Sequence, residues 1–349
     1  MAASSTGPLA VISGAVASGE VPGAVGIFGT RDSVSAPLVG GVRRTGGPAT
    51  TAETHYDLAS LSKVVSTLPC LLRLVSDGEV RLDHTVRHFI SNAGWFQSPS
   101  LGEVTLCDLL THTSGLPAWS PLYSRSSQRR TLLAAALQTE LRQPGALVYS
   151  DLGFIVLGAI IERVTRLRQD AFAAEVVFGP LGMTSTAYGP TRVGTPVAAT
   201  EDCGWRNEVL EGVVHDENCF ALDGVSGHAG LFSTAADLAR YAQAWLTLDE
   251  RLGREEVLVT ARQTQVQADG LRRGYGWLLK GEDSFGGPRA TVEGFGHTGF
   301  TGTSLWIEPG DDWFAVLLTN RVHPVRTGGP HMHAIRRDFH EAVAAALLG

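Results

Sequence analysis

The sequence predicts an α/β protein of the α+β type, with one antiparallel sheet flanked by helices and an all-helical lobe inserted into it. Two observations carry this prediction. Stretches typical of strands lie near both ends of the chain, whereas apolar residues at helical spacing fill its middle. The most economical arrangement joins both ends of the chain in the same sheet. At roughly 150 residues per domain, 349 residues give a prior of about two domains and ample length for a large core.

The local patterns predict each element in turn. Across residues 60–77, apolar side chains recur at helical spacing, Pro69 should bend the helix and Asp77-Gly78 should end it. Residues 234–248 predict a helix with Ser233 as its N-cap. The other expected elements are a helix over 8–19, strands over 21–28 and 36–42, helices over 104–112, 131–141 and 151–166, a long ordered loop region over 186–230, strands over 275–280, 290–297, 302–308 and 313–319, and a helix over 333–348.

Composition and charge exclude several classes of protein. The formal charge is -7, with 28 Lys and Arg against 35 Asp and Glu, and no basic run occurs. We therefore expect neither a nucleic acid nor a membrane as partner. The apolar N-terminal stretch has no positively charged start and is interrupted by glycine and proline, so it predicts neither a signal peptide nor a membrane span. These features favour a cytoplasmic protein.

The cysteines and a histidine pair give little support for a metal or redox site. No C-x-x-C pair occurs, and Cys70 and Cys107 lie in apolar stretches typical of buried helices. A Cys203–Cys219 disulfide is the less favoured alternative, because we expect a reducing compartment. His331-Met332-His333 lacks a third nearby ligand, so we interpret it as the start of a surface helix. We predict no metal and no cofactor.

The most informative segment is Ser60-Leu61-Ser62-Lys63, at the start of a predicted helix. Residues three apart share one helix face, so the Lys63 ammonium can reach the Ser60 hydroxyl. The positive field of a helix N-terminus also favours an anionic oxygen there. These are conditions that an acyl-transfer nucleophile needs. Taken alone the S-x-x-K spacing is common by chance, and a serine at a helix start is often only a cap.

Two further motifs follow in order along the chain: Tyr149-Ser150-Asp151 before an apolar helix, and His297-Thr298-Gly299 at the edge of a predicted strand. The order S-x-x-K, Y-x-[ND], [KH]-T-G resembles that of the serine β-lactamase and penicillin-binding-protein superfamily. The histidine in the third motif is similar to the branch of DD-carboxypeptidases and D-aminopeptidases, alongside class C β-lactamases and related esterases. The segments 109–117 and 227–233 are also typical of it. The resemblance covers about residues 15–345.

The resemblance implies a β-lactamase/transpeptidase-like fold and a role for each matching residue. Ser60 would be the nucleophile that forms an acyl-enzyme. Lys63 would help to deprotonate it, and Tyr149 would pass the proton to the leaving group; which of the two is the base stays open. The backbone N–H groups of Ser60 and Phe300 would form the oxyanion hole, where loss of one donor typically costs about 100- to 1,000-fold in rate.

The resemblance also implies that Thr298 and Gly299 line the edge strand on which an extended substrate docks. Two positions depart from the family pattern. Asp151 replaces the usual Asn, so it can only accept hydrogen bonds and should hold Lys63 protonated. This argues against ordinary β-lactam and peptide handling. His297 replaces the usual Lys, so its charge should vary near physiological pH and its hold on a substrate carboxylate should be weaker. This favours a peptidase or esterase over a true β-lactamase.

Several other residues allow a functional and a structural interpretation. The polar cluster at 215–218 either shapes the substrate pocket or forms a surface loop held by Asx-type hydrogen bonds. His112 is expected to be structural, together with Ser114. Trp119 and Tyr123 either overhang the site and contact an apolar substrate group or simply pack.

We therefore predict a serine hydrolase that acts on a small ester, a D-amino-acid amide or a peptide through Ser60. The alternatives are a β-lactamase or penicillin-binding protein with weak β-lactam turnover, and a non-catalytic binding relative. The partner is a small-molecule or peptide substrate. Residues 1–60 with 225–349 should form the lobe that contains the sheet, and residues 61–224 the helical lobe with the long active-site loops. No G-x-S-x-G, H-E-x-x-H or Walker A motif competes with this interpretation.

Overall fold

A computed structural model describes residues 7–90, 101–327 and 331–349. The helices are α1 (Pro8–Ala17), α2 (Leu68–Ser76), α3 (Val86–Phe89), α4 (Leu106–Leu110), α5 (Arg129–Leu137), α6 (Asp151–Thr165), α7 (Gln169–Ala173), α8 (Glu217–Ala221), α9 (Ala235–Leu246), α10 (Glu255–Ala261) and α11 (Met332–Leu348), with π-helical turns at Lys63–Thr67 and Ala174–Phe178 and 3-10 turns at Leu101–Glu103 and Leu122–Ser124. The strands are β1 (Gly23–Gly29), β2 (Leu38–Gly41), β3 (Tyr56–Asp57), β4 (Ala187–Tyr188), β5 (Asp202–Cys203), β6 (Glu208–Val209), β7 (Leu231–Ser233), β8 (Val266–Ala268), β9 (Leu271–Arg273), β10 (Leu278–Leu279), β11 (Phe295–Thr298), β12 (Ser304–Glu308) and β13 (Trp313–Thr319).

The main sheet joins the two ends of the chain, as the sequence predicts. Within the described residues it has eight strands in the order β2-β1-β13-β12-β11-β10-β9-β8, and neighbouring strands run antiparallel. Strand β1 pairs with β13 over most of its length, from Ala24 opposite Thr319 to Gly29 opposite Phe314. The centre of the sheet is therefore made of residues about 290 positions apart in the chain, a separation read from that register.

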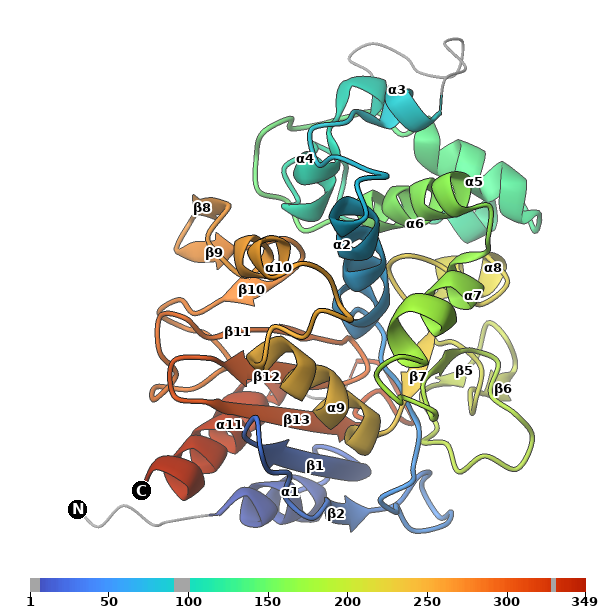
Figure 1. Cartoon of the computed structure of the whole chain (residues 1–349). Coiled ribbons are helices and arrows are strands. Elements are labelled where there is room, and N and C mark those ends of the chain that lie inside the picture. The colour runs from blue at the N-terminus through green and yellow to red at the C-terminus, as the bar shows by residue number, and fades with distance from the viewer. Residues whose placement is uncertain (1–6, 91–100, 328–330) are drawn as a thin grey trace.

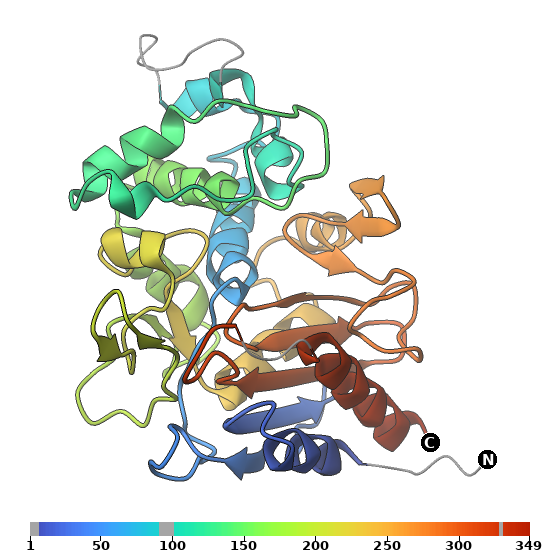
Figure 2. The same cartoon turned by 180° about the vertical axis from the view of Figure 1, so that it is seen from behind.

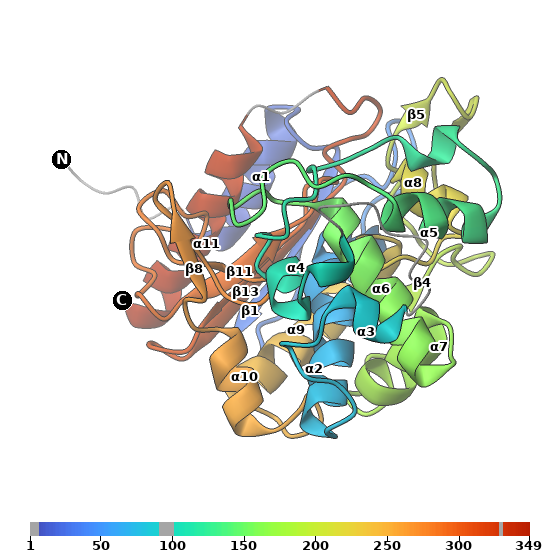
Figure 3. The same ribbon diagram turned by 90° about the horizontal axis from the view of Figure 1, so that it is seen from above.

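Helices cover both faces of this sheet. Helix α9 packs on β1, β12 and β13 on one face (Figure 1), and α1 and α11 lie together on the other face (Figure 2). Helices α5, α6 and α7 lie to one side of the molecule, and β8 and β11 to the other (Figure 3). Helix α2 stands between these parts in Figure 1. The predicted class, antiparallel sheet with flanking helices, is confirmed.

The helix predicted over 60–77 starts differently from the prediction. The chain forms a π-helical turn over Lys63–Thr67 before α2 begins, and the Leu68 N–H donates to the carbonyl oxygen of Lys63. Pro69 then lies in the first turn of α2, where its missing N–H leaves no hydrogen bond unmade. The proline is thus accommodated by a change of helix type directly before it.

Several predicted boundaries were wrong, among them that of the strand over 275–280, of which only β10 forms, and two others have a visible cause. Ser233 belongs to strand β7, and the N-cap of α9 is Thr234, whose hydroxyl accepts from the Asp237 N–H at 3.4 Å. The strand predicted over 290–297 is reduced to β11, because the Thr291 N–H donates to the Glu308 carboxylate at 2.8 Å instead of to a neighbouring strand. In the first case a local capping bond decides the boundary, and in the second a side chain from the neighbouring strand β12 does.

The sequence did not predict the β8–β9 hairpin, which lies at the edge of the sheet. Its strands have three residues each, too few for alternation to show. The Asp269-Gly270 pair was the one sequence feature that could have predicted this hairpin, because Asp-Gly favours two-residue hairpin turns. In the structure both residues have the positive φ that such a turn needs. The region over 186–230 is ordered, as predicted, but it also contains short strands and helix α8.

Two further expectations concern cysteines and membranes. Cys203 and Cys219 are both free and buried, so the less favoured disulfide does not form. Among the described residues, no helix combines the length and apolar character needed to cross a bilayer.

Helix α6 reaches its place through a close backbone approach at two glycines. A Cβ added at Gly227 would lie 1.9 Å from the carbonyl oxygen of Phe154, and one at Gly158 would lie 2.9 Å from the Gly227 nitrogen. Backbone atoms cannot move aside as a flexible side chain can. The pair therefore sets how closely α6 packs against the segment that leads into β7.

We predict that Gly227→Ala destabilises the protein by about 3 kcal/mol or more, because the added methyl group forces backbone apart. Gly14→Ala is the matched control. Gly14 lies inside α1, and an added Cβ there meets nothing within 4 Å, so a gain of about 0.5–1 kcal/mol is expected. Urea unfolding measures both changes, and equal midpoints for the two variants would contradict the prediction.

Candidate active site

A strained turn presents Ser60 at the end of the segment that follows β3. Ala59 has a φ of +46°, which is unusual for a residue with a side chain. Its N–H donates to the Asp57 Oδ1 at 2.8 Å, and this bond holds the turn. Lys63 then donates from Nζ to the Ser60 Oγ at 2.9 Å. The predicted contact between the two residues of the first motif is present.

The Lys63 ammonium is fully buried, and three oxygens surround it. Nζ donates to the Ser60 Oγ and, at 3.3 Å, to the carbonyl oxygen of His228, and it lies 2.7 Å from the Asp151 Oδ1. Burial lowers the pKa of Lys63, but the charges and hydrogen bonds of Asp151 and Tyr149 outweigh it and raise the pKa above its usual value. Lys63 is therefore an ammonium at neutral pH, as the aspartate at 151 predicts.

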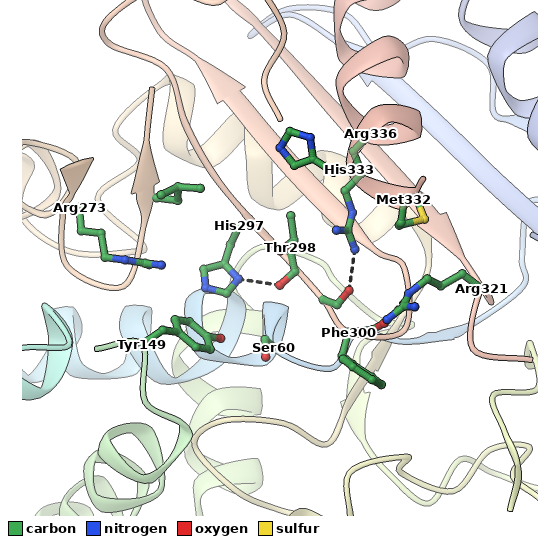
Figure 4. A pocket seen from close by; sticks show the side chains of 12 residues that line it. Ser60, Tyr149, Arg273, His297, Thr298, Phe300, Arg321, Met332, His333 and Arg336 are labelled. Carbon is green, nitrogen blue, oxygen red and sulfur yellow. Dashed lines mark hydrogen bonds between the residues drawn. The ribbon is translucent and has the colours of Figure 1, made fainter. Parts of the chain in front are cut away.

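Tyr149 lies between two cations, directly before the start of α6. Its ring centroid is 4.9 Å from the Lys63 Nζ and 5.3 Å from the guanidinium carbon of Arg273. The next residue, Ser150, is the N-cap of α6, and its Oγ accepts from the Gly153 N–H at 3.2 Å. Tyr149 and Ser60 line the same cavity (Figure 4). The structure thus brings the first two motifs together.

His112 holds the chain that carries Tyr149, which agrees with the structural role expected for it. Its Nδ1 accepts from the Ser150 N–H at 3.0 Å, and its ring packs on the Tyr149 ring with centroids 4.6 Å apart. Burial, followed by the charges of Arg273 and Lys63, lowers the pKa of His112 well below its usual range. The neutral ring is the form that can accept this bond. Ser114 accepts from the Leu116 N–H at 3.3 Å nearby.

The third motif ends β11 and turns toward Ser60. Strand β11 lies between β12 and β10, so it is not the edge strand expected for Thr298 and Gly299. A Cβ at Gly299 would lie 2.4 Å from the carbonyl oxygen of Leu58 and 2.1 Å from the Thr303 Oγ1, so only glycine fits. Within the described chain, neither the Ser60 N–H nor the Phe300 N–H has a hydrogen-bond acceptor. Both residues line a cavity of about 470 Å³ (Figure 4). Two unused donors beside a serine hydroxyl are what an oxyanion hole requires.

The charge of the His297 imidazole does not vary near physiological pH, contrary to the expectation from the sequence. The residue is 4% exposed, and its Nδ1 lies 2.8 Å from the carbonyl oxygen of Thr298. Burial, with the charges of Lys63 and Arg273, lowers the pKa of His297 well below its usual range. The expectation that its charge varies near physiological pH was wrong, because a buried imidazole beside two cations stays neutral there.

Arg273 is a candidate binding residue that the sequence reading missed. It ends β9, it is 9% exposed, and it lines the same cavity as Ser60. Its Nε and Nη1 are buried, and neither has a hydrogen-bond partner among the described residues. Arg321 and Arg336 line the cavity from another side (Figure 4). The Asp269-Gly270 turn was the only sequence feature that indicated β9. No residue pattern around Arg273 connects it with Ser60.

A second cavity, of about 290 Å³, lies beside Ser60 and is lined by Trp119 and by part of the 215–218 loop. Asp216 caps α8 by accepting from the Cys219 N–H at 2.7 Å, so the loop is held by an Asx-type bond and shapes a pocket as well. Trp119 is 44% exposed, which agrees with the overhanging position considered for it. Tyr123 packs on Trp205 instead, with ring centroids 5.1 Å apart.

His331 and His333 lie exposed at the start of α11, as predicted, and His333 also lines the cavity of Ser60. In the described ranges no group of three or more His, Cys, Asp and Glu is arranged to hold a metal ion.

The fold and the three motifs define a class, the serine hydrolases built on the β-lactamase/transpeptidase-like fold. Residues 10–337 match the family model described as Beta-lactamase, and the chain belongs to this family. A protein of Escherichia coli strain K12 named "Putative D-alanyl-D-alanine carboxypeptidase" is 34% identical over 310 residues, which are 78% of this chain and 70% of that protein.

Solved structures show the same fold at low identity. A class C β-lactamase from Rhodobacter sphaeroides has a TM-score of 0.77 at 19% identity, covering 99% of this chain and 100% of that one. EstCE1, described as a hydrolase with promiscuous acyltransferase activity, has a TM-score of 0.78 at 22% identity, covering 95% of this chain and 98% of that one. The family match and the Escherichia coli relative, together with this fold, make the chain a hydrolase of the serine β-lactamase and penicillin-binding-protein superfamily.

We predict that Asp151→Asn shifts the pH dependence of activity to lower pH. Removing the carboxylate leaves burial to dominate, so the pKa of Lys63 falls and its neutral form appears at a lower pH. In the wild type Lys63 stays an ammonium, whereas in Asp151→Asn its neutral form can serve as a base, so kcat/KM should rise at a pH lower by one unit or more, roughly the effect of one close charge. The measurement is kcat/KM for an uncharged p-nitrophenyl ester from pH 5 to 10.

Asp338→Asn is the control for this experiment. Asp338 is an exposed carboxylate on α11 that pairs with Arg337, so its loss should leave the profile in place. An unchanged profile in Asp151→Asn would show that the carboxylate at 151 does not govern the protonation on which the rate depends.

Proposed function

We propose that the protein hydrolyses an amide or ester whose substrate carries a carboxylate, through an acyl-enzyme on Ser60. The observation that supports this most is the charge of the cavity that Ser60 opens into. Arg273, Arg321 and Arg336 line it, and none of its described lining residues is acidic. A cavity of this kind favours an anionic substrate group.

The proposed reaction starts with attack of the Ser60 Oγ on the substrate carbonyl carbon. The oxygen of the tetrahedral intermediate accepts from the N–H groups of Ser60 and Phe300. The proton that leaves Ser60 passes to the leaving group, whose bond to the carbonyl carbon breaks. We assign this transfer to Tyr149, because Asp151 holds Lys63 as an ammonium. Water then cleaves the Ser60 ester, releases the acid and restores the hydroxyl.

Arg273 is the residue that we assign to the substrate carboxylate. Its buried guanidinium has two nitrogens without acceptors in the described structure, which is costly unless a ligand supplies one. His297 stays neutral, so it contributes a hydrogen bond at most. The name of the Escherichia coli relative supports a substrate that ends in a carboxylate, since a carboxypeptidase acts at a chain terminus. Peptides ending in D-alanyl-D-alanine are therefore the first substrates to test.

Two other functions are distinguished by the same substrates. Ester hydrolysis with acyl transfer is favoured by the likeness to EstCE1 and by the exposed Trp119 beside Ser60. Asp151 is paired with Lys63 and cannot donate to the amide carbonyl of a β-lactam or of a peptide, so it favours an ester over both. The peptide is placed before the β-lactam because of the name of the Escherichia coli relative.

We predict that Ser60→Ala abolishes turnover, with a loss of at least about 1,000-fold. The substrates are a p-nitrophenyl ester, a chromogenic cephalosporin and a peptide ending in D-alanyl-D-alanine. Mass spectrometry of the wild-type protein should detect an acyl adduct on Ser60. Turnover that survives Ser60→Ala would remove this residue as nucleophile, and no adduct and no turnover with any substrate would favour the non-catalytic alternative.

We predict that Arg273→Met raises KM about 10- to 100-fold for the peptide with a free carboxylate, the range expected for a charge-assisted hydrogen bond. The same peptide with an amidated C-terminus should bind both proteins equally well. Arg337→Met is the matched control, because that arginine is exposed and pairs with Asp338. An equal effect of Arg273→Met on both peptides would contradict the assignment.

A further inference from the structure

We propose that Arg336 is a positioning residue that aims the Phe300 N–H at the reacting carbonyl oxygen, by binding the oxygen at the other end of the same peptide group. The inference rests on the proposed function of the site. It adds a residue from α11 that none of the three motifs contains. Figure 4 shows the contact between Arg336 and the turn that carries Phe300.

The geometry of the turn supports this role. The Gly299 carbonyl oxygen accepts from the Gly302 N–H at 3.0 Å and from the Arg336 Nη2 at 2.7 Å. This carbonyl and the Phe300 N–H belong to one planar trans peptide group, so they point in opposite directions. A guanidinium that fixes the direction of the oxygen therefore fixes the direction of the N–H as well. That N–H has no acceptor within the described residues.

The charge of Arg336 also strengthens the donor. A cation bound to a carbonyl oxygen draws electron density from the peptide group and makes its N–H more acidic, as in any chain of polarised hydrogen bonds. Burial and the charge of Arg321 lower the pKa of Arg336 to about 9, so it still carries its charge at neutral pH. Its effect on the Phe300 N–H is therefore both geometric and electronic.

Other contacts fasten the same turn to the chain that carries Ser60. The Thr301 hydroxyl donates to the carbonyl oxygen of Asp57 at 2.7 Å, and the Thr303 hydroxyl donates to that of Leu58 at 3.1 Å. Arg321 donates from Nε to the carbonyl oxygen of Phe300 at 2.9 Å. These bonds fix where the turn lies. Arg336 is the cation that binds the peptide group of the donor itself.

If Arg336 bound the substrate directly, its replacement would change the kinetics differently than if it positions the oxyanion donor. Arg336 lines the cavity, and its Nε is buried without a hydrogen-bond partner in the described chain. If Arg336 only bound a substrate anion, its loss would raise KM for anionic substrates and spare neutral ones. If it positions the oxyanion donor, its loss lowers kcat for neutral and anionic substrates alike.

The experiment compares Arg336→Met, Arg336→Lys and the control Arg337→Met on an uncharged p-nitrophenyl ester. We expect Arg336→Met to lower kcat about 10- to 100-fold with little change in KM, somewhat less than the loss of a whole oxyanion donor. Affinity for a boronic acid, which forms a tetrahedral adduct on serine, should fall by a similar factor. Arg336→Lys should restore part of both, and Arg337→Met should change neither. Thermal unfolding shows whether each variant is folded.

An NMR measurement separates this inference from the proposed function. In protein labelled with 15N-phenylalanine, Phe300→Leu identifies the Phe300 amide signal, and Arg336→Met should move that proton upfield because the peptide group loses its cation. This shift is expected even if no substrate is turned over. Absence of Ser60-dependent turnover with the shift present would reject the proposed function alone. An unmoved Phe300 amide, or an effect on KM of anionic substrates only, would overturn the role of Arg336.

Discussion

The rest of the site depends on one interaction, the binding of the buried Lys63 ammonium by three oxygens. A charge removed from water is costly unless several oxygens replace its hydration shell. Here the oxygens come from three places in the chain: the Ser60 hydroxyl, the Asp151 carboxylate and the carbonyl of His228. The segment after β3, the first turn of α6 and the segment before β7 must therefore meet at one point, and their meeting also sets the position of Ser60.

Close backbone packing makes that meeting possible. At Gly227 the chain touches the backbone of α6, and at Gly299 it touches the backbone just before Ser60. A side chain at either position would push the contributing segments apart by more than a hydrogen bond can span. The many glycines of the sequence thus matter most where two backbones meet, and two of those places tie the helical part and the sheet to the nucleophile.

Charge is divided between the two sides of Ser60. Three arginines and no acidic residue line one cavity, whereas three carboxylates and one arginine, Arg326, line the other. The low pKa of His297 follows from this division, because an imidazole near Lys63 and Arg273 gains nothing from a further proton. Asp216 shows the opposite effect. Burial would raise the pKa of the Asp216 carboxyl. The charge of His228, and the hydrogen bonds that this carboxyl accepts from His228 and from the Cys219 N–H, lower the pKa far below its usual range.

The sequence by itself determined the class of fold and the local chemistry. Residues three apart on one helical face bring Ser60 to Lys63, and the pairing of strands from both ends follows from where strand-like segments occur. Only the tertiary structure decided the state of His297, the presence of Arg273 in the cavity and the contact of Arg336 with Gly299. Each of these depends on burial and on partners distant in the chain. No local pattern contains that information, since periodicity describes a residue's own element and not what packs against it.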